Sequence, residues 1–264
     1  MSKVGVRLKL VSKIAEFSER YYKEILTERH FKEKHSVDIK RLHDDWWEAM
    51  KFFLSRVLYQ GRRDELSERV EKEVRKVLDY YFKDPSQREH NFDTLRRQNW
   101  RELRKKLEGK IGKGKVGRGR DIELVIDTLR FISQLPDKNI VNYSVRQIED
   151  GKLEDLWRSL QHSKSKTGIR SVGEKTASFY LRDLVALLNL ESKIHRGQEY
   201  LQPIDTWVRK VCKMIGFEKE GQELRKNIVE TCNSLGVSPI RFNMGAWYVG
   251  THALNILLKL LEKN

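Results

Sequence analysis

Apolar residues recur three and four positions apart along much of the chain, and this spacing limits most what the chain can fold into. Ile122, Val125, Ile126, Leu129 and Ile132 are an example, because such spacing places side chains on one face of an α-helix. No alternating pattern predicts a pair of strands, and the sequence contains only four prolines to interrupt its helices. An all-α fold is therefore predicted.

Similar patterns predict further helices, several of them bounded by proline or glycine. They cover about residues 8–29, 38–59, 64–82, 94–108, 144–161, 173–190, 205–216, 219–235 and 239–262. The second of these is rich in aromatic residues and is expected to end at a glycine C-cap, Gly61. The glycine-rich, basic segment 109–120 is expected to be a mobile connection between helices or a hinge between lobes.

The charge balance predicts a polyanionic partner. The chain has 264 residues, with 53 Lys and Arg against 38 Asp and Glu, for a formal net charge of +15. Such an excess favours nucleic acid, because binding releases counterions from the phosphates. A highly charged thermophile surface is the alternative. It would explain the amount of charge but not its sign.

The cysteine content and the hydropathy of the chain indicate the cellular compartment. Cys212 and Cys232 are the two cysteines, too few for a disulfide framework or a four-cysteine metal site. Both lie in apolar helical patterns, which predicts buried thiols in a reducing compartment. The stretch from Leu8 to Ile14 is interrupted by polar residues, and no run reaches the ~20 apolar residues of a membrane span. We therefore expect an intracellular protein, in cytoplasm or nucleoid, with no membrane partner.

The segment 171–175, Ser-Val-Gly-Glu-Lys, combines a tight turn with the start of a helix. Glycine lets the backbone approach a phosphate closely, and a helix start offers free N–H groups and a positive dipole end. Thr176 and the cations of Lys164, Lys166 and Arg170 could add phosphate contacts. The alternative is an ordinary turn between two packed helices.

Lys175 and Asp205 are the candidate catalytic residues. A neutral amine in the first turn of a helix can attack an electrophilic carbon and form a Schiff base. Asp205 follows Pro203 and precedes an apolar helical pattern, so it is a natural N-cap, and its carboxylate could stabilise a developing cation or accept a proton. A solvated lysine and a plain cap are the alternatives. The connection over 191–204 could span about 45 Å, so the chain permits the two residues to meet.

These residues resemble the helix-hairpin-helix DNA glycosylases, the base-excision superfamily that includes endonuclease III and the 8-oxoguanine DNA glycosylases. The family hairpin commonly reads Leu-Pro-Gly-Val-Gly-x-Lys-x-Ala, where this chain has Ile169 to Ala177, with Arg170 and Ser171 in place of Pro-Gly. Lys175 matches the lysine that attacks the sugar in members with lyase activity. The motif at the next helix start makes Asp205 the match of the catalytic aspartate.

The resemblance also assigns residues outside the catalytic pair. The spacing from Lys175 to Asp205 resembles that of the archaeal 8-oxoguanine glycosylases. By that likeness Trp247 would stack on the damaged base, and Asn243 would line the base pocket where those relatives have an acidic residue. Gln60 would lie near the gap left by the extruded base. The other DNA contacts expected are Arg170, Ser171, Gly173, Thr176 and Arg209.

The resemblance implies two helical lobes with a helix-hairpin-helix motif and an interlobe cleft. Residues 1–115 would form an N-terminal helical region with part of the second lobe. Residues 116–204 would form a lobe with the motif at about 160–184, and 205–264 the C-terminal helices that complete the cleft.

The implied activity is that of a bifunctional DNA glycosylase and AP lyase of base excision repair. It would flip an oxidised purine, 8-oxoguanine first, out of double-stranded DNA. A monomer is expected, with no metal or organic cofactor, although a monovalent cation could bind at the hairpin. A non-catalytic helix-hairpin-helix DNA-binding protein and a monofunctional glycosylase for another damaged base are the alternatives.

Overall fold

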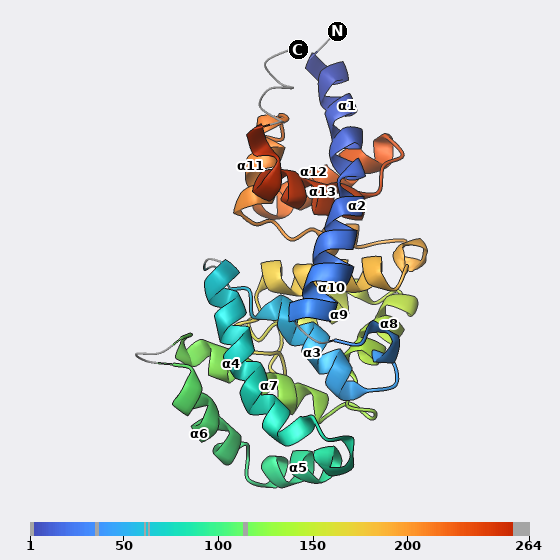
Figure 1. The fold of residues 1–264 in the computed structure, drawn as a ribbon. Helices are drawn as coiled ribbons and strands as arrows, with labels where there is room; N and C mark the ends of the chain where they lie inside the picture. The colour runs from blue at the N-terminus through green and yellow to red at the C-terminus, as the bar shows by residue number, and fades with distance from the viewer. Residues whose placement is uncertain (1–2, 35–36, 61, 63, 113–115, 256–264) are drawn as a thin grey trace. The chain divides into compact units, whose positions relative to one another are not determined.

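The computed structural model describes residues 3–34, 37–60, 62, 64–112 and 116–255 (Figure 1). These residues form helices and no strand, apart from isolated bridges at Ile111–Val116 and Gln161–Ile169, so the all-α prediction is confirmed. Gly61, the expected C-cap, and residues 113–115 of the basic segment lie outside the described residues. The helices are α1 (Lys3–Glu16), α2 (Ser18–Arg20), η1 (Tyr21–Lys34), η2 (Ile39–Arg41), α3 (Trp46–Val57), α4 (Asp64–Phe82), α5 (Pro85–Arg97), α6 (Arg101–Lys110), α7 (Gly119–Ile132), α8 (Ile140–Glu149), α9 (Leu153–Ser159), α10 (Glu174–Leu187), η3 (Glu191–Lys193), η4 (Gln198–Leu201), α11 (Thr206–Met214), α12 (Gly221–Ser234) and α13 (Pro239–His252).

The chain divides into two compact units, each built from separate stretches of sequence. Unit 1 comprises Met1–Ser36, Ile148–Glu154 and Leu181–Asn264, and unit 2 comprises Val37–Gln147 and Asp155–Tyr180. Helix α10 contributes residues to both units. The predicted boundaries at 115/116 and 204/205 follow the chain in order, and they do not coincide with the boundaries of these interleaved units.

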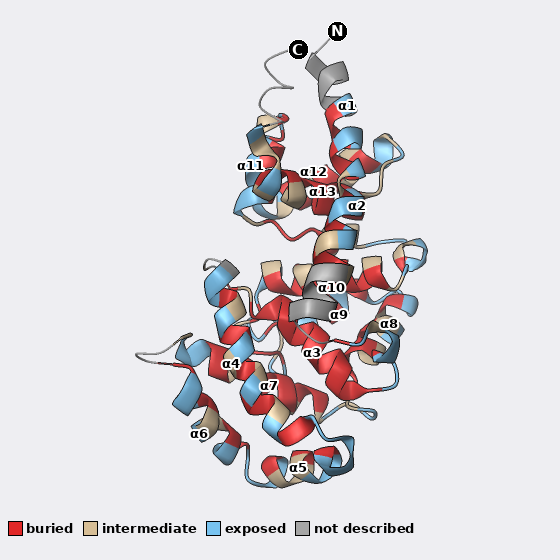
Figure 2. Ribbon diagram, viewed as in Figure 1, coloured by how far each residue is buried: buried red, intermediate tan, exposed pale blue. Residues whose placement is uncertain are grey.

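Helix α3 forms the centre of unit 2. All of its residues are buried (Figure 2), which its aromatic-rich sequence favours. Asp45 caps the helix and accepts a hydrogen bond from the backbone N–H of Trp47 at 2.8 Å. The Trp46 ring packs edge-on against Phe82 and Phe92, with centroids 5.4 and 5.2 Å away. This aromatic cluster joins α3 to α4 and α5.

Four of the predicted helices are interrupted, so the predictions of single helices there are wrong. The range 8–29 is divided among α1, α2 and η1, and the range 38–59 is divided between η2 and α3. The range 94–108 contains the junction of α5 and α6, where Trp100 has a left-handed backbone with φ of 61°. Its indole is 2% exposed and lies 5.2 Å from the Phe92 ring, so burial of a large side chain outweighs the backbone cost. The range 144–161 is divided between α8 and α9 by Gly151, with φ of 72°.

Helix α13 is the central helix of unit 1 and packs against α1 and α11. Its two glycines allow this close packing. A Cβ on Gly245 would lie 1.9 Å from the carbonyl oxygen of Ile14, and a Cβ on Gly250 would lie 2.8 Å from the Cβ of Trp207. The core also includes Val208, Val211, Cys212, Leu224, Ile228, Cys232, Phe242 and Ala246. Both cysteines are buried, as predicted.

We expect Gly245→Ala to destabilise the protein by about 1–3 kcal/mol, because the new methyl group overlaps a backbone atom that cannot rotate away. Urea unfolding followed by circular dichroism would measure this loss. Gly109→Ala is the matched control, because a Cβ there meets nothing within 4 Å. The control should be neutral or slightly stabilising. Equal stabilities of the two variants would contradict the close packing of α13 on α1.

Candidate functional site

Residues 169–173, called the hairpin below, lie in unit 2 between α9 and α10 and form the tight turn expected before α10. Ser171, which replaces a glycine of the family pattern, has a left-handed φ of 68°. The N–H of Val172 donates to the carbonyl of Ile169 at 3.1 Å, which closes the turn. The N–H of Ile169 in turn donates to Leu160 at 3.1 Å and ties the hairpin to the end of α9. A residue with a Cβ therefore adopts the conformation for which glycine is usual.

Gln60 is buried and holds the hairpin in place. Its Nε2 donates to the carbonyl oxygens of Ser171 at 2.7 Å and Val57 at 3.2 Å. The DNA contact of Gln60 stays a prediction, and its amide is already hydrogen-bonded within unit 2. Arg120 donates to the Gln60 carbonyl at 3.4 Å, and its own carbonyl accepts from the Ser171 hydroxyl at 3.3 Å. The end of the basic segment thus lies beside the hairpin, a juxtaposition that the sequence did not predict.

The start of α10 presents Lys175 in its first turn, as predicted. The side chain is partly exposed, and within the described part of unit 2 its amine has no hydrogen-bond or ion-pair partner. Thr176 is buried, and its hydroxyl bonds to the N–H and the carbonyl of Gly173 at 3.1 Å. Gly173 is exposed, and a Cβ there would meet nothing within 4 Å. Thr176 therefore shapes the turn, while Gly173 leaves it open to a close approach.

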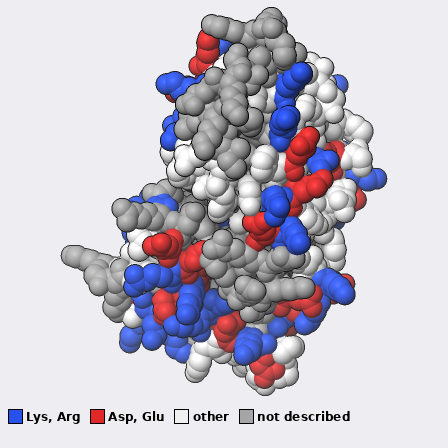
Figure 3. Space-filling view, turned by 45° about the horizontal axis from the view of Figure 1, so that its top comes forward, with Lys and Arg blue, Asp and Glu red and all other residues white. Residues whose placement is uncertain are grey.

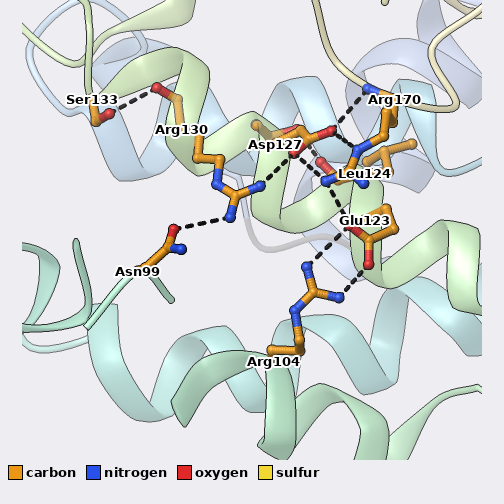
Figure 4. Close-up of polar contacts among 9 residues, drawn as sticks. Asn99, Arg104, Glu123, Leu124, Asp127, Arg130, Ser133 and Arg170 are labelled. Atoms are coloured by element: carbon orange, nitrogen blue, oxygen red, sulfur yellow. Dashed lines mark hydrogen bonds and ion pairs between the residues drawn. The ribbon is translucent and has the colours of Figure 1, made fainter. Parts of the chain in front are cut away.

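The guanidinium of Arg170 forms ion pairs with two carboxylates of α7 (Figure 4). Its Nε and Nη2 donate to Asp127 at 2.5 and 2.9 Å, and Nη2 lies 2.6 Å from Glu123. Burial alone would raise the pKa of Asp127, but hydrogen bonds from Arg170 hold that pKa below its usual value. A hydrogen bond from Arg104 likewise lowers the pKa of Glu123. A contact of Arg170 with DNA stays a prediction.

Asp205 lies in unit 1 and is the N-cap of α11, as predicted. Its φ and ψ are −97° and −175°, and its Oδ1 accepts from the N–H of Val208 at 2.8 Å. Pro203 and Ile204, just before it, are buried and fix the start of the helix. Lys175 belongs to unit 2, so the approach of these two side chains to one sugar stays a prediction.

A buried polar network lies beside this helix start. Arg182 and Asp183 of α10 are 1% and 0% exposed, and the Arg182 Nη2 donates to Asp183 at 2.7 Å. The hydroxyl of Tyr21 bonds to both side chains, at 3.0 Å for Asp183 Oδ2. Arg182 Nη1 donates to the Asn243 oxygen at 2.8 Å, and the Asn243 nitrogen donates to the Pro203 carbonyl at 3.4 Å. The network thus reaches the segment that precedes Asp205.

The charges of this network are complementary. Burial alone would lower the pKa of Arg182, but the carboxylate of Asp183 raises it, and the nearby carboxylate of Asp205 acts in the same direction. Asn243 is fully buried, with its amide bonded inside unit 1. A role of Asn243 in a base pocket stays a prediction.

The remaining predicted contacts lie on α11 and α13 of unit 1. Trp247 is partly buried against the core, and its ring lies edge-on to Tyr21 with centroids 5.4 Å apart. Arg209 is exposed on α11, where a phosphate could reach it. Stacking of Trp247 on a base and binding of Arg209 to DNA stay predictions.

Sequence reasoning did not find the carboxylates that organise these elements. Asp127 occurs within the apolar pattern of α7, and Arg182-Asp183 interrupts the apolar pattern of α10. A charged residue inside an apolar helical repeat is the signal that could have found them, because buried charges need partners.

The described residues contain no cluster of metal ligands, and the two thiols are buried. No three His, Cys, Asp or Glu side chains of these residues gather as metal ligands would. Burial raises the pKa of the Cys232 thiol to about 12, so it is a poor nucleophile. The carbonyls of Ser171 and Gly173 already accept hydrogen bonds, and a monovalent cation at the hairpin stays a prediction. No described helix has both the length and the apolar character to cross a bilayer.

Comparison with known proteins gives little further information. No protein-family model and no solved structure matches the chain. A stretch of 112 residues, 41% of this chain, is 31% identical to a protein named enolase from Metallosphaera sedula and covers 25% of that protein. The chain thus spans about a quarter of the length of the curated relative that it matches. A match of this extent shows no family.

Proposed function

We propose that this chain is a DNA glycosylase with AP-lyase activity, which removes an oxidised purine, 8-oxoguanine first, from double-stranded DNA. The observation that carries the proposal is the start of α10, where a tight turn with an exposed Gly173 leads directly to a partly exposed Lys175. Helix starts with free N–H groups bind phosphate. The amine of Lys175, the second residue of α10, would then lie close to the sugar of the bound nucleotide.

The charge of the protein supports a DNA partner. The net charge is +15, and Figure 3 shows Lys and Arg side chains gathered in the lower left of the view. Lys166, just before the hairpin, and Arg118, at the start of α7, are exposed cations of unit 2. Contacts between such cations and phosphates are independent of base sequence. This suits an enzyme that must search intact DNA for rare damage.

Lys175 is assigned the nucleophilic attack on the sugar. A damaged base is first rotated out of the stack, because its glycosidic bond is unreachable inside a duplex. The neutral amine of Lys175 attacks C1′ of the deoxyribose, and the glycosidic electron pair leaves with the base, which takes up a proton. Loss of a proton from nitrogen and opening of the sugar ring give a Schiff base. Removal of a C2′ proton then expels the 3′ phosphate with its electron pair and nicks the strand.

Asp205 is assigned the stabilisation of positive charge on the sugar. As the C1′–nitrogen bond lengthens, the ring oxygen and C1′ share a developing cation, and a fixed carboxylate favours this state more than the ground state. The bond from Val208 at 2.8 Å fixes Asp205 Oδ1 and leaves Oδ2 for this task. The proposal requires Asp205 of unit 1 and Lys175 of unit 2 to act on the same deoxyribose.

A nicking assay over a panel of lesion duplexes tests this function. We expect base loss and strand cleavage at 8-oxoguanine, with no cleavage of intact duplex. Base loss that needs alkali to cleave the strand would favour a monofunctional glycosylase. Equal affinity for damaged and intact duplex, without base loss on any lesion, would favour a non-catalytic DNA-binding protein and overturn the proposal.

The turn itself gives a separate prediction. Gly173→Ala should weaken duplex binding about tenfold or more, because a methyl group there would block one charge-assisted bond between backbone and phosphate, worth ~1.5–3 kcal/mol. Stability should be unchanged, because the added Cβ meets nothing within 4 Å. Fluorescence anisotropy with a labelled duplex would measure the binding. Gly109→Ala, equally open, should bind as the wild type does. Unchanged affinity in Gly173→Ala would exclude a phosphate at this turn.

A further inference from the structure

We propose that Arg170 is a positioning residue. Its hydrogen bonds and ion pairs with Asp127 and Glu123, called the clasp below, keep the hairpin in the shape needed to bind a DNA phosphate. This inference rests on the proposed function. It assigns a task to two carboxylates to which sequence reasoning gave none. It also replaces the expectation that Arg170 itself contacts DNA.

The clasp holds both the backbone and the side chain of one hairpin residue. Oδ2 of Asp127 accepts from the backbone N–H of Arg170 at 3.2 Å and from its Nε at 2.5 Å, while Oδ1 accepts from Nη2 at 2.9 Å. The guanidinium therefore meets the carboxylate as a two-point fork, which fixes orientation as well as distance. Asp127 is anchored in the middle of α7, and its side chain is only 11% exposed.

A second layer of charges holds the carboxylates in turn (Figure 4). Glu123 lies 2.6 Å from Arg170 Nη2 and is paired by both Nη atoms of Arg104, at 3.0 Å for Nη2. Arg130 donates to Asp127 at 3.2 Å. Three guanidiniums thus face two carboxylates, and the cluster ties the hairpin to α6 and α7.

The neighbouring residue explains why a clasp is needed. Ser171 has a left-handed φ of 68°, a strained conformation for a residue with a Cβ, so adjacent contacts must maintain it. Gln60 holds its carbonyl on one side, at 2.7 Å, and the bonded Arg170 fixes the chain on the other. Without the clasp, the turn between Arg170 and Gly173 is expected to relax, and it would no longer hold the start of α10 in place for a phosphate.

Duplex affinity measured over a series of salt concentrations separates a clasp from a phosphate contact. We expect Arg170→Ala and Asp127→Asn each to weaken binding about tenfold, and the double variant to be no weaker than either. The slope of the logarithm of the duplex-binding constant against the logarithm of salt concentration should equal that of the wild type. A lost phosphate contact would instead reduce that slope by about 1.

The direction in which Asp127→Asn changes duplex affinity distinguishes the two roles of Arg170 most clearly. This change removes a negative charge, so electrostatics alone would tighten binding to DNA. Asp93→Asn on α5 is the matched control, because the Asp93 side chain is 38% exposed, and this variant should bind as tightly as the wild type or slightly tighter. Tighter binding by Asp127→Asn, or a reduced salt slope in Arg170→Ala, would overturn the clasp.

Hydrogen exchange of the free protein tests the clasp without DNA. Amides of residues 169–173 should exchange faster in both variants, while those of α3 should not change. Unchanged exchange in the hairpin would overturn the inference even if the protein bound DNA. If the wild type bound no duplex, the proposed function would fail, whereas faster exchange in the variants would still support the clasp.

Discussion

Lys175→Gln is expected to lose strand nicking by at least about a thousandfold, a change of ~4 kcal/mol in the barrier, while duplex affinity changes little. Glutamine has a similar length but no nucleophilic amine, so it can neither displace the base nor form a Schiff base. Single-turnover nicking of an 8-oxoguanine duplex, with enzyme in excess, measures the step without contributions from product release.

Lys166→Gln is the matched control for this variant. Lys166 is an exposed lysine in the connection that leads to the hairpin, so the same chemical change is made close by. It should retain nicking at saturating enzyme, with at most a weaker affinity from one lost cation. Nicking that survived in Lys175→Gln would remove this lysine from the mechanism. Equal losses in the two variants would point to a general effect of charge.

Asp183→Asn is expected to destabilise the protein by about 3–5 kcal/mol, because it leaves the Arg182 guanidinium as a buried charge without its carboxylate. Both side chains are essentially unexposed, and they lie 2.7 Å apart. The Tyr21 hydroxyl and the Asn243 amide cannot neutralise the guanidinium. Urea unfolding followed by circular dichroism at 222 nm gives the free energy of unfolding.

Asp150→Asn is the control within the same unit. Its carboxylate is 55% exposed and pairs with Lys152 at 3.3 Å, an arrangement worth at most about 1 kcal/mol. Arg182→Met combined with Asp183→Asn should recover part of the lost free energy of unfolding, because no buried charge then remains unpaired. A loss below ~1 kcal/mol in Asp183→Asn would mean that the pair is not buried in solution.

Local patterns predicted much of the fold. The three- and four-residue apolar spacing correctly predicted an all-α protein, and α4, α11 and α12 begin and end close to the predicted ranges. The failures occurred where distant packing decides the backbone. Trp100 ends a helical pattern because its indole is buried against Phe92, which no local propensity predicts. The interleaving of two units is likewise a property of contacts between distant stretches.

The candidate site was predictable only in part, for the same reason. A lysine after a turn and an aspartate before an apolar helix are local features, and the structure has Lys175 in the first turn of α10 and Asp205 as the cap of α11. The bonds that hold the turn are not local. Gln60 is 111 residues from Ser171, and Asp127 is 43 residues from Arg170. A sequence taken alone cannot show that such pairs meet.

Borohydride trapping on a lesion-containing duplex, followed by peptide mapping of the adduct, tests whether a lysine amine attacks the sugar. We expect one covalent complex, with the deoxyribose remnant on Lys175, which disappears in Lys175→Gln and forms slowly in Asp205→Asn. An adduct on another residue, or no adduct with any oxidised or abasic duplex, would contradict the lyase mechanism.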